Sequence, residues 1–167
     1  MNRLLFAALV ALTTACARPA PVTTVVLVRH AERPPGSDPE LNASGQARAE
    51  SLAVALTRAG VDAIIHTQFK RTQQTAAPLA ARLGITPIVV AATGTEADHA
   101  RAVVQRIDAL KGKTVVYVGH SNTVPAVIAA LGITPPPPVA ETEYANFFIV
   151  TRRGNGPPSL VRVRYAP

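Results

Sequence analysis

The sequence predicts an α/β protein, a single three-layer α/β/α domain with a mostly parallel central sheet. Its 167 residues are typical of one domain and leave no room for a second substantial one. Apolar residues make up 48% and charged residues 16%, which is enough apolar material for a sizeable core. From residue 23 onward, short β-branched runs alternate with stretches of helical apolar spacing. Such alternation is typical of right-handed β–α–β units on a parallel sheet.

Six strands are expected. Residues 24–28 form a continuous β-branched run, as in a strand that is buried on both faces. The last two strands are expected to form a hairpin at the sheet edge, through a turn at residues 153–156. The other predicted strands are residues 63–65, 87–90, 114–118, 146–151 and 160–165.

Four helices are expected from apolar side chains at helical spacing. The first begins with Asn42 or Ser44 as its N-cap and ends at Gly60. Pro78 lies within the second helix and is expected to kink it. The four apolar stripes cover residues 49–56, 76–83, 100–107 and 124–131.

The first 21 residues are predicted to be an export signal with a short tether, and residues 22–167 the folded domain. Arg3 precedes an apolar run over residues 4–12 that is too short to span a bilayer, and small residues follow it. Two cleavage patterns compete. One releases a soluble periplasmic protein, with Cys16 as just another small residue, and the other is a lipoprotein signal that leaves Cys16 as the lipidated N-terminus. The lipoprotein signal is preferred because Cys16 is the only cysteine and sits at the cut. We therefore expect an exported bacterial protein of the periplasm or the outer membrane, with membrane attachment through Cys16.

The chain is strongly basic, with 17 Lys and Arg residues against 10 Asp and Glu residues and a formal net charge of +7. This charge favours an anionic partner, such as a phosphorylated molecule, an anionic membrane surface or nucleic acid. The absence of tryptophan and an aromatic content of only 4% argue against a base-stacking surface, and so against nucleic acid. A single cysteine excludes a disulfide framework and a cysteine-based zinc site.

Polar side chains gather shortly after three of the predicted strands. Arg29 and His30 follow the first strand, Arg71 comes after the second, and His120 follows the fourth. Because ligands bind where the carboxyl ends of parallel strands meet, we expect these residues to converge at one edge of the sheet. Arginines repel a metal cation and cannot ligate it, whereas guanidinium groups match phosphate oxygens. The sequence therefore predicts a phosphate site that requires no metal, in which a neutral imidazole can attack phosphorus.

The same segments resemble motifs of the histidine phosphatase superfamily, in particular its compact branch 1 members. Arg29-His30 resembles that family's Arg-His-Gly motif, and residues 38–47 resemble the start of its first helix. Residues 66–76 are similar to the segment that carries its second arginine, and residues 118–122 resemble its second histidine motif. The four motifs occur in the family's order.

This resemblance implies a phosphoglycerate-mutase-like fold and a phosphatase that works without a metal or cofactor. In such an enzyme His30 would be the nucleophile that becomes phosphohistidine. Arg29 and Arg71 would bind the phosphoryl group of the substrate, and His120 would stabilise the transition state. Asn122 would either donate a further hydrogen bond to the substrate or only cap the following helix.

The chain departs from the family's motifs at three positions close to these residues. Ala31 replaces the glycine that follows the nucleophile. His66 and Thr67 replace two serines, which is expected to alter the support of Arg71.

Three carboxylates are candidates for the general acid that protonates the leaving group. Branch 1 enzymes usually supply this acid after the third strand, where Glu96 is the first choice by position and Asp98 the second. Glu32, two residues beyond His30, is the rival. Without an acid in reach, the enzyme would strongly favour leaving groups of low pKa.

The main functional hypothesis is an exported phosphatase that hydrolyses a small phosphomonoester or a phosphoprotein through His30. A mutase is disfavoured, because glycolytic intermediates are not expected outside the cytoplasm. The first alternative is a catalytically weak or inactive envelope lipoprotein that binds a phosphate-like anion in the same pocket. The second is a basic surface that binds anionic lipid or polysaccharide, and its salt-sensitive association would survive loss of His30.

Overall fold

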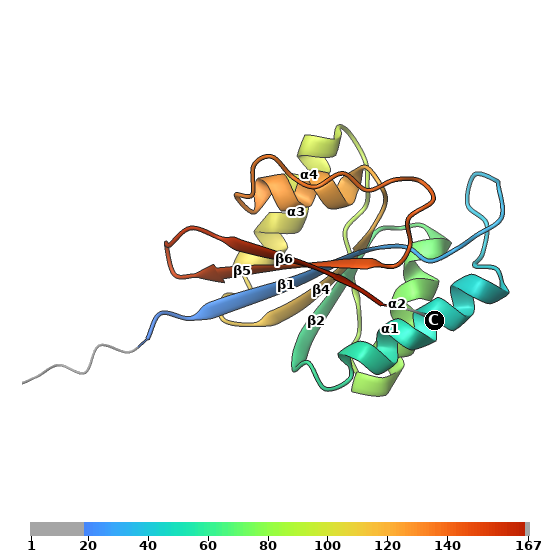
Figure 1. Cartoon of the computed structure of the whole chain (residues 1–167), viewed down its shortest axis with the longest axis horizontal. Helices are drawn as coiled ribbons and strands as arrows, with labels where there is room; N and C mark the ends of the chain where they lie inside the picture. The colour runs from blue at the N-terminus through green and yellow to red at the C-terminus, as the bar shows by residue number, and fades with distance from the viewer. Residues whose placement is uncertain (1–18, 166–167) are drawn as a thin grey trace, which may run out of the picture.

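Strands and helices alternate along the chain as the sequence predicts, in a computed structural model that describes residues 19–165 (Figure 1). The strands are β1 Val22–Arg29, β2 Val61–His66, β3 Ile88–Val89, β4 Thr114–Gly119, β5 Asn146–Arg153 and β6 Ser159–Arg164. The helices are α1 Ala43–Leu56, α2 Lys70–Leu83, α3 Glu96–Asp108 and α4 Thr123–Ala130. The predicted export signal, with Cys16, lies outside the described residues.

The strands form one six-stranded sheet in the order β3-β2-β4-β1-β5-β6. The first four strands run parallel, β5 is antiparallel to β1, and β6 is antiparallel to β5, so the mostly parallel sheet and its edge hairpin are confirmed. Arg29 at the end of β1 is level with Gly119 at the end of β4. Val28 is level with Phe147, near the start of β5. The segments that follow β1 and β4 and the segment that precedes β5 therefore meet at one edge of the sheet.

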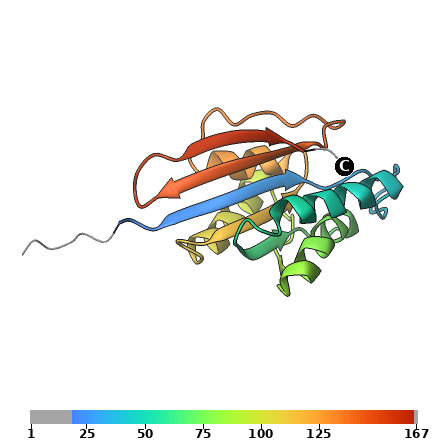
Figure 2. The same cartoon turned by 60° about the horizontal axis from the view of Figure 1, so that its bottom comes forward.

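A layer of helices covers each face of the sheet, which confirms the three-layer architecture (Figure 2). Successive side chains of a strand point to opposite faces, and β1 shows this directly. Val25 and Leu27 pack in the cluster with α3 and α4, whereas Val26 and Val28 pack in the cluster with α1 and α2. All four side chains are at most 3% exposed. Burial of each such side chain contributes about 1.5–3 kcal/mol, so this central strand holds both layers in place.

The helix boundaries refine the predicted ones. Asn42, one of the two predicted caps, begins α1, and its Oδ1 accepts a hydrogen bond from the Gly45 N–H at 2.9 Å. α2 begins at Lys70, ahead of the apolar stripe that starts at residue 76, because its first turn is polar and faces the site described below. α2 also continues through Pro78 to its end at Leu83.

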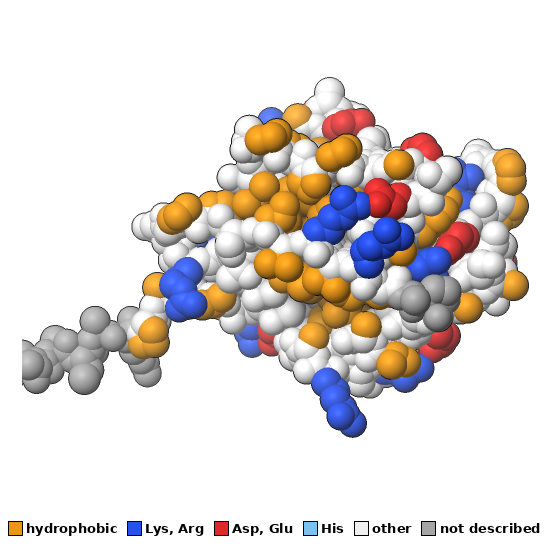
Figure 3. Space-filling view, in the orientation of Figure 1, with side chains coloured by type: hydrophobic (Ala, Val, Ile, Leu, Met, Phe, Trp, Pro, Cys, Tyr) orange, Lys and Arg blue, Asp and Glu red, His pale blue; other side chains and the backbone are white. Residues whose placement is uncertain are grey.

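The basic residues do not merge into one patch on the face shown in Figure 3, where they lie apart from one another or beside acidic side chains. Arg82 pairs with Glu50 at 2.8 Å, and Arg162 pairs with Glu143. This face therefore offers no concentrated basic surface. Between residues 19 and 165, no helix is both long and apolar enough to cross a bilayer.

Candidate active site

His30 and His120 lie side by side at the carboxyl end of the sheet, as the sequence predicts. They are neighbours because Arg29 and Gly119 are level, so the next residue of each segment leaves the sheet at the same place. The backbone N–H of His30 donates to the Gly119 carbonyl at 2.9 Å, and the two imidazole centroids are 5.4 Å apart. The two residues are only 3% and 8% exposed, respectively.

The ring of His30 is held in the form that a nucleophile needs. Its Nδ1 lies 2.8 Å from the Ala31 carbonyl, and a carbonyl can only accept, so Nδ1 carries the hydrogen and Nε2 keeps its lone pair. Burial, aided by the positive charges of Arg29 and Arg71, lowers the pKa of His30 to about 4. The imidazole is therefore neutral at pH 7. Ala31, which replaces the motif glycine, is fully buried, and its N–H donates to Thr75 Oγ1 at 2.9 Å.

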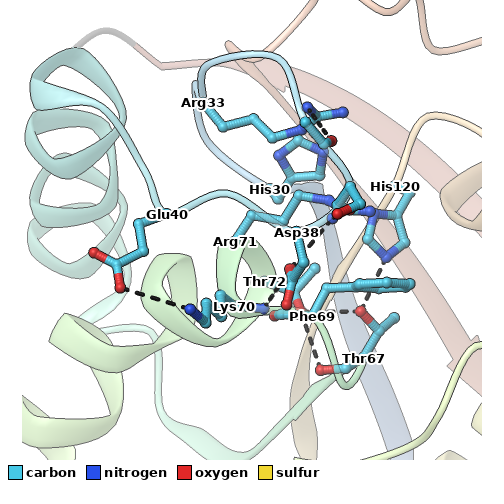
Figure 4. Close-up of polar contacts among 12 residues, drawn as sticks. His30, Arg33, Asp38, Glu40, Thr67, Phe69, Lys70, Arg71, Thr72 and His120 are labelled. Atoms are coloured by element: carbon cyan, nitrogen blue, oxygen red, sulfur yellow. Dashed lines mark hydrogen bonds and ion pairs between the residues drawn. The ribbon is translucent and has the colours of Figure 1, made fainter.

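A chain of hydroxyl groups orients the ring of His120 (Figure 4). The Thr72 hydroxyl donates to the carbonyl oxygens of Thr67 and Phe69 at 3.0 and 2.8 Å. Thr72 Oγ1 must then accept the hydrogen of Thr67 Oγ1 at 2.9 Å, and Thr67 Oγ1 must accept from His120 Nε2, also at 2.9 Å. Burial is the main cause that lowers the pKa of His120, to about 3. The sequence predicts that Thr67 affects the position of Arg71. In the structure its hydroxyl binds the ring of His120.

Arg29 is buried at the end of β1 and is held by the segment that precedes β5. Its Nη1 donates to the Ala140 carbonyl at 2.9 Å, and its Nη2 donates to a Glu141 oxygen at 2.8 Å. Its guanidinium carbon lies 4.2 Å from the ring centre of Tyr144. Since only 3% of the side chain is exposed, its position is set by these contacts.

Arg71 reaches the site from the first turn of α2, and Arg33 reaches it from the loop after β1. The guanidinium of Arg71 stacks 4.2 Å from the ring centre of Phe69 and lies 3.5 Å from Asp38 Oδ1. Burial is the main cause that lowers the pKa of Arg71, and the neighbouring charge of Arg33 adds to it. Arg33 was not among the predicted site residues. Its position three residues after His30 was the signal that could have found it.

Arg33 and Arg71 line a cavity of about 260 Å³, and Arg29 binds Glu141 on its lining. The Nε atoms of Arg29, Arg33 and Arg71 are all buried and have no hydrogen-bond partner. An unpaired buried donor costs about 1–3 kcal/mol, so three of them at one place indicate that an anion is the missing partner. The cavity is lined by His30, Arg33, Phe69, Arg71, Ala92, His120, Ser121, Asn122, Thr123 and Glu141. Within residues 19–165 there is no cluster of three His, Cys, Asp or Glu side chains that could hold a metal ion.

The three predicted candidates for the general acid are each held by another side chain. Both oxygens of Glu32 lie 2.8 Å from Arg48 Nε. Asp98 forms a capping box with Thr95 at the start of α3 and also binds Arg101 at 2.9 Å.

Glu96 and Asn122 bind each other at the rim of the site. Asn122 occupies the N-cap position of α4, but its side chain makes no capping hydrogen bond. Its Nδ2 instead donates to Glu96 Oε1 at 2.8 Å. Asn122 lines the cavity, whereas Glu96 is not among the lining residues. The predicted contact of Asn122 with the substrate stays a prediction.

Glu141 is the carboxylate that lines the cavity, and it was not predicted. It lies between α4 and β5, where the sequence has no apolar periodicity. Its place follows from the antiparallel pairing of β5 with β1, which brings the residues before Phe147 next to Arg29. That pairing was the missing signal, since the sequence predicts the hairpin at an edge but not which strand it joins.

Comparison with known proteins gives one family and many similar folds. The model of the histidine phosphatase superfamily (branch 1) matches residues 25–98. The solved structure of mycobacterial hydrolase 1 has a TM-score of 0.69 and 18% identity, over 87% of this chain and 100% of that one. A mycobacterial glucosyl-3-phosphoglycerate phosphatase has a TM-score of 0.63 and 20% identity, over 78% and 90% of the chains. The protein histidine phosphatase SixA, complexed with tungstate, has a TM-score of 0.66 and 17% identity, over 84% and 96%. No curated protein sequence matches significantly.

At these identities the structural likeness shows a common fold. The family model covers the segments that carry Arg29, His30 and Arg71, and the common fold extends over most of the remaining chain. Residues 25–98 of the chain are therefore similar to the histidine phosphatase superfamily, branch 1.

Proposed function

We propose that the protein is an exported phosphatase that hydrolyses phosphomonoesters or a phosphoprotein through a covalent phosphohistidine on His30, without a metal ion or a cofactor. The observation that carries this proposal is a neutral imidazole with a free Nε2 lone pair on a cavity lined by Arg33 and Arg71, which, like the neighbouring Arg29, each keep an unpaired Nε. The first feature is a nucleophile, and the second binds the group that it attacks.

The reaction proceeds in two displacements at phosphorus. Nε2 of His30 attacks the phosphoryl group in line with the leaving oxygen, so the N–P bond forms as the P–O bond breaks. Arg29 and Arg71 stabilise the charge on the equatorial oxygens, and His120 places a second imidazole beside the transferring group. A water molecule then attacks phosphorus, the N–P bond breaks, and His30 recovers its lone pair as phosphate leaves.

The three arginines are also the reason for proposing that the reaction uses no metal ion. Three guanidinium groups supply the positive charge that a divalent cation supplies in other phosphoryl-transfer enzymes, and they would repel such a cation. The mobile cation is replaced by fixed charges, which need no reorganisation during the reaction.

Two substrate classes fit this site. The names of two similar structures state their substrates, glucosyl-3-phosphoglycerate in one case and protein phosphohistidine in the other. The cavity is close to the surface, since the side chain of Glu141 on its lining is 76% exposed. A phosphate on a small molecule or on a protein side chain can therefore enter it.

The test is hydrolysis of p-nitrophenyl phosphate by residues 22–167 with EDTA present, beside His30→Ala. We expect turnover by the wild type, its loss in His30→Ala, and an acid-labile phosphoenzyme in the wild type alone. Circular dichroism would confirm that both proteins fold. No turnover by folded wild-type protein from about pH 4.5 to 8 would contradict phosphatase activity, and the anion-binding lipoprotein would become the better account.

We also propose that the chain is exported to the periplasm and lipidated at Cys16. Support comes from Arg3, the apolar run at residues 4–12 and the position of the one cysteine. Expression of the full chain in a Gram-negative bacterium should place it in the membrane fraction, and Cys16→Ala should remove the lipid. A full-length wild-type chain without lipid on Cys16 would contradict this proposal.

A further inference from the structure

Glu141 occupies the proposed phosphate site in a way that no other described carboxylate does. Its Oε2 lies 2.8 Å from Arg29 Nη2, and its Oε1 accepts a hydrogen bond from the Ser121 hydroxyl. Ser121 follows His120 directly, and both line the cavity together with Glu141. One carboxylate thus connects the end of β1 to the segment after β4, within the cavity that contains the nucleophile.

A bound substrate affects the two contacts of Glu141, with Arg29 and with Ser121, in different ways. The phosphoryl oxygens need the donors of Arg29, so a bound substrate competes with Oε2 for that guanidinium. The Ser121 hydroxyl already donates to Oε1 and can keep that hydrogen bond. The carboxyl group would then remain in the cavity with Oε2 free beside the substrate.

We propose that Glu141 is the general acid and base of the reaction, an inference that rests on the proposed phosphatase function. As His30 Nε2 forms its bond to phosphorus and the bond from phosphorus to the leaving oxygen breaks, the proton on Glu141 Oε2 passes to that oxygen. This leaves an alcohol and the Glu141 carboxylate. In the second displacement the carboxylate takes a proton from the attacking water as its oxygen bonds to phosphorus and the N–P bond breaks. Phosphate, neutral His30 and protonated Glu141 result.

The charges around Glu141 explain how it gains its first proton. Without substrate, the hydrogen bond from Ser121 and the positive charges of Arg29 and Arg33 hold the pKa of Glu141 below its usual range. Arg71 also faces it from α2. A phosphoryl dianion brings like charge next to the carboxylate and engages these arginines, and both effects raise the carboxyl pKa. The proton comes from water, because 76% of the side chain is exposed.

The test compares Glu141→Gln with the wild type on two substrates that differ in their leaving group. Phenolate is a poorer leaving group than p-nitrophenolate, which departs with little need of a proton. For Glu141→Gln we expect kcat/KM for phenyl phosphate to fall about 10²-fold or more, with p-nitrophenyl phosphate falling less than about tenfold. The matched control is Glu143→Gln, on the same segment but bound to Arg162, and it should lie within about twofold of the wild type on both substrates.

Other outcomes overturn the assignment in distinct ways. Equal losses on both substrates would make Glu141 a positioning residue for Arg29. Faster turnover in Glu141→Gln, with tighter phosphate inhibition, would make it a carboxylate that blocks the site. Values of kcat/KM within about twofold of the wild type on both substrates would exclude it from the reaction. If the folded wild type hydrolysed neither substrate, the phosphatase function itself would fail, which is a different result from all of these.

Discussion

The two ends of the parallel strands differ in how completely their charged side chains are paired within the protein. At the amino end, Asp62 accepts hydrogen bonds from Lys113 Nζ and from the Thr114 N–H at 2.9 and 2.8 Å. Arg152 pairs there with Asp108 at 2.7 Å. These partners all come from the protein, so the end is complete by itself.

At the carboxyl end, three arginines have buried nitrogen atoms that lack a hydrogen-bond partner. Arg29, Arg33 and Arg71 each keep an unpaired buried Nε, next to two imidazoles whose pKa values are lowered by burial. Folded proteins seldom leave buried donors unpaired, because each costs free energy. The amino end of the sheet therefore contributes to the stability of the fold. At the carboxyl end, the unpaired donors lower this stability and leave positions that an anion can bind.

The largest expected effect comes from removing a cation at the incomplete end. Arg71→Ala should lower kcat/KM for p-nitrophenyl phosphate by about 10²–10³-fold, because it deletes a donor that stabilises charge in the transition state. Arg152→Ala removes the same side chain at the complete end and should change kcat/KM by less than about twofold. Steady-state kinetics on both variants measure this contrast, and equal losses would abolish the distinction between the ends.

A second prediction concerns pH, since burial keeps the two imidazoles neutral. Burial lowers the pKa of His30 to about 4 and that of His120 to about 3. Both rings therefore stay neutral well below the usual histidine pKa of about 6.5. For p-nitrophenyl phosphate, whose leaving group departs with little need of a proton, kcat/KM corrected for ionisation of the substrate should stay level down to about pH 5 and fall only near pH 4. A pH–rate profile that already falls near pH 6.5 would contradict the neutral nucleophile.

The same lowered pKa values have a consequence for stability. Between about pH 4 and 6.5 the unfolded chain binds more protons than the folded chain, so the free energy of unfolding falls as the pH drops through this window. The loss for His30 should be of the order of 3 kcal/mol. His30→Gln removes this titration, and its urea midpoint should depend less on pH than that of the wild type. Equal slopes for the two proteins would show that burial of His30 does not shift its pKa.

A third, smaller effect tests the hydroxyl chain that orients His120. Thr67→Val keeps the shape of the side chain but removes the acceptor of the His120 Nε2–H. We expect kcat/KM to fall about tenfold and the unfolding free energy to fall by about 1–3 kcal/mol, because a buried donor loses its partner. Thr93→Val, in an exposed loop, should change neither quantity. Unchanged kinetics in Thr67→Val would mean that His120 needs no orientation.

The sequence predicts the elements whose residues repeat with a period, and the motifs that follow parallel strands. The buried strands and the convergence of Arg29, His30, Arg71 and His120 at one sheet edge belong to this group. The start of α2 could not be predicted from periodicity, because its first turn faces the site and carries polar residues. Glu141 could not be predicted either, because its place depends on which strand β5 pairs with, and this long-range contact leaves no local pattern.

The smallest effect is expected at the complete end, and it shows whether the two ends are independent. Asp62→Asn weakens the bonds to Lys113 and Thr114, so the melting temperature should fall by a few degrees at most, while kcat/KM stays within about twofold. Six strand residues separate the ends by about 20 Å, a distance at which mutational free energies usually add. In the double variant with Arg71→Ala, the loss of activity should therefore equal that of Arg71→Ala alone. A lower kcat/KM in the double variant than in Arg71→Ala alone would show that the two ends of the sheet are energetically coupled. The paired charges at the amino end would then help to position the side chains of the site.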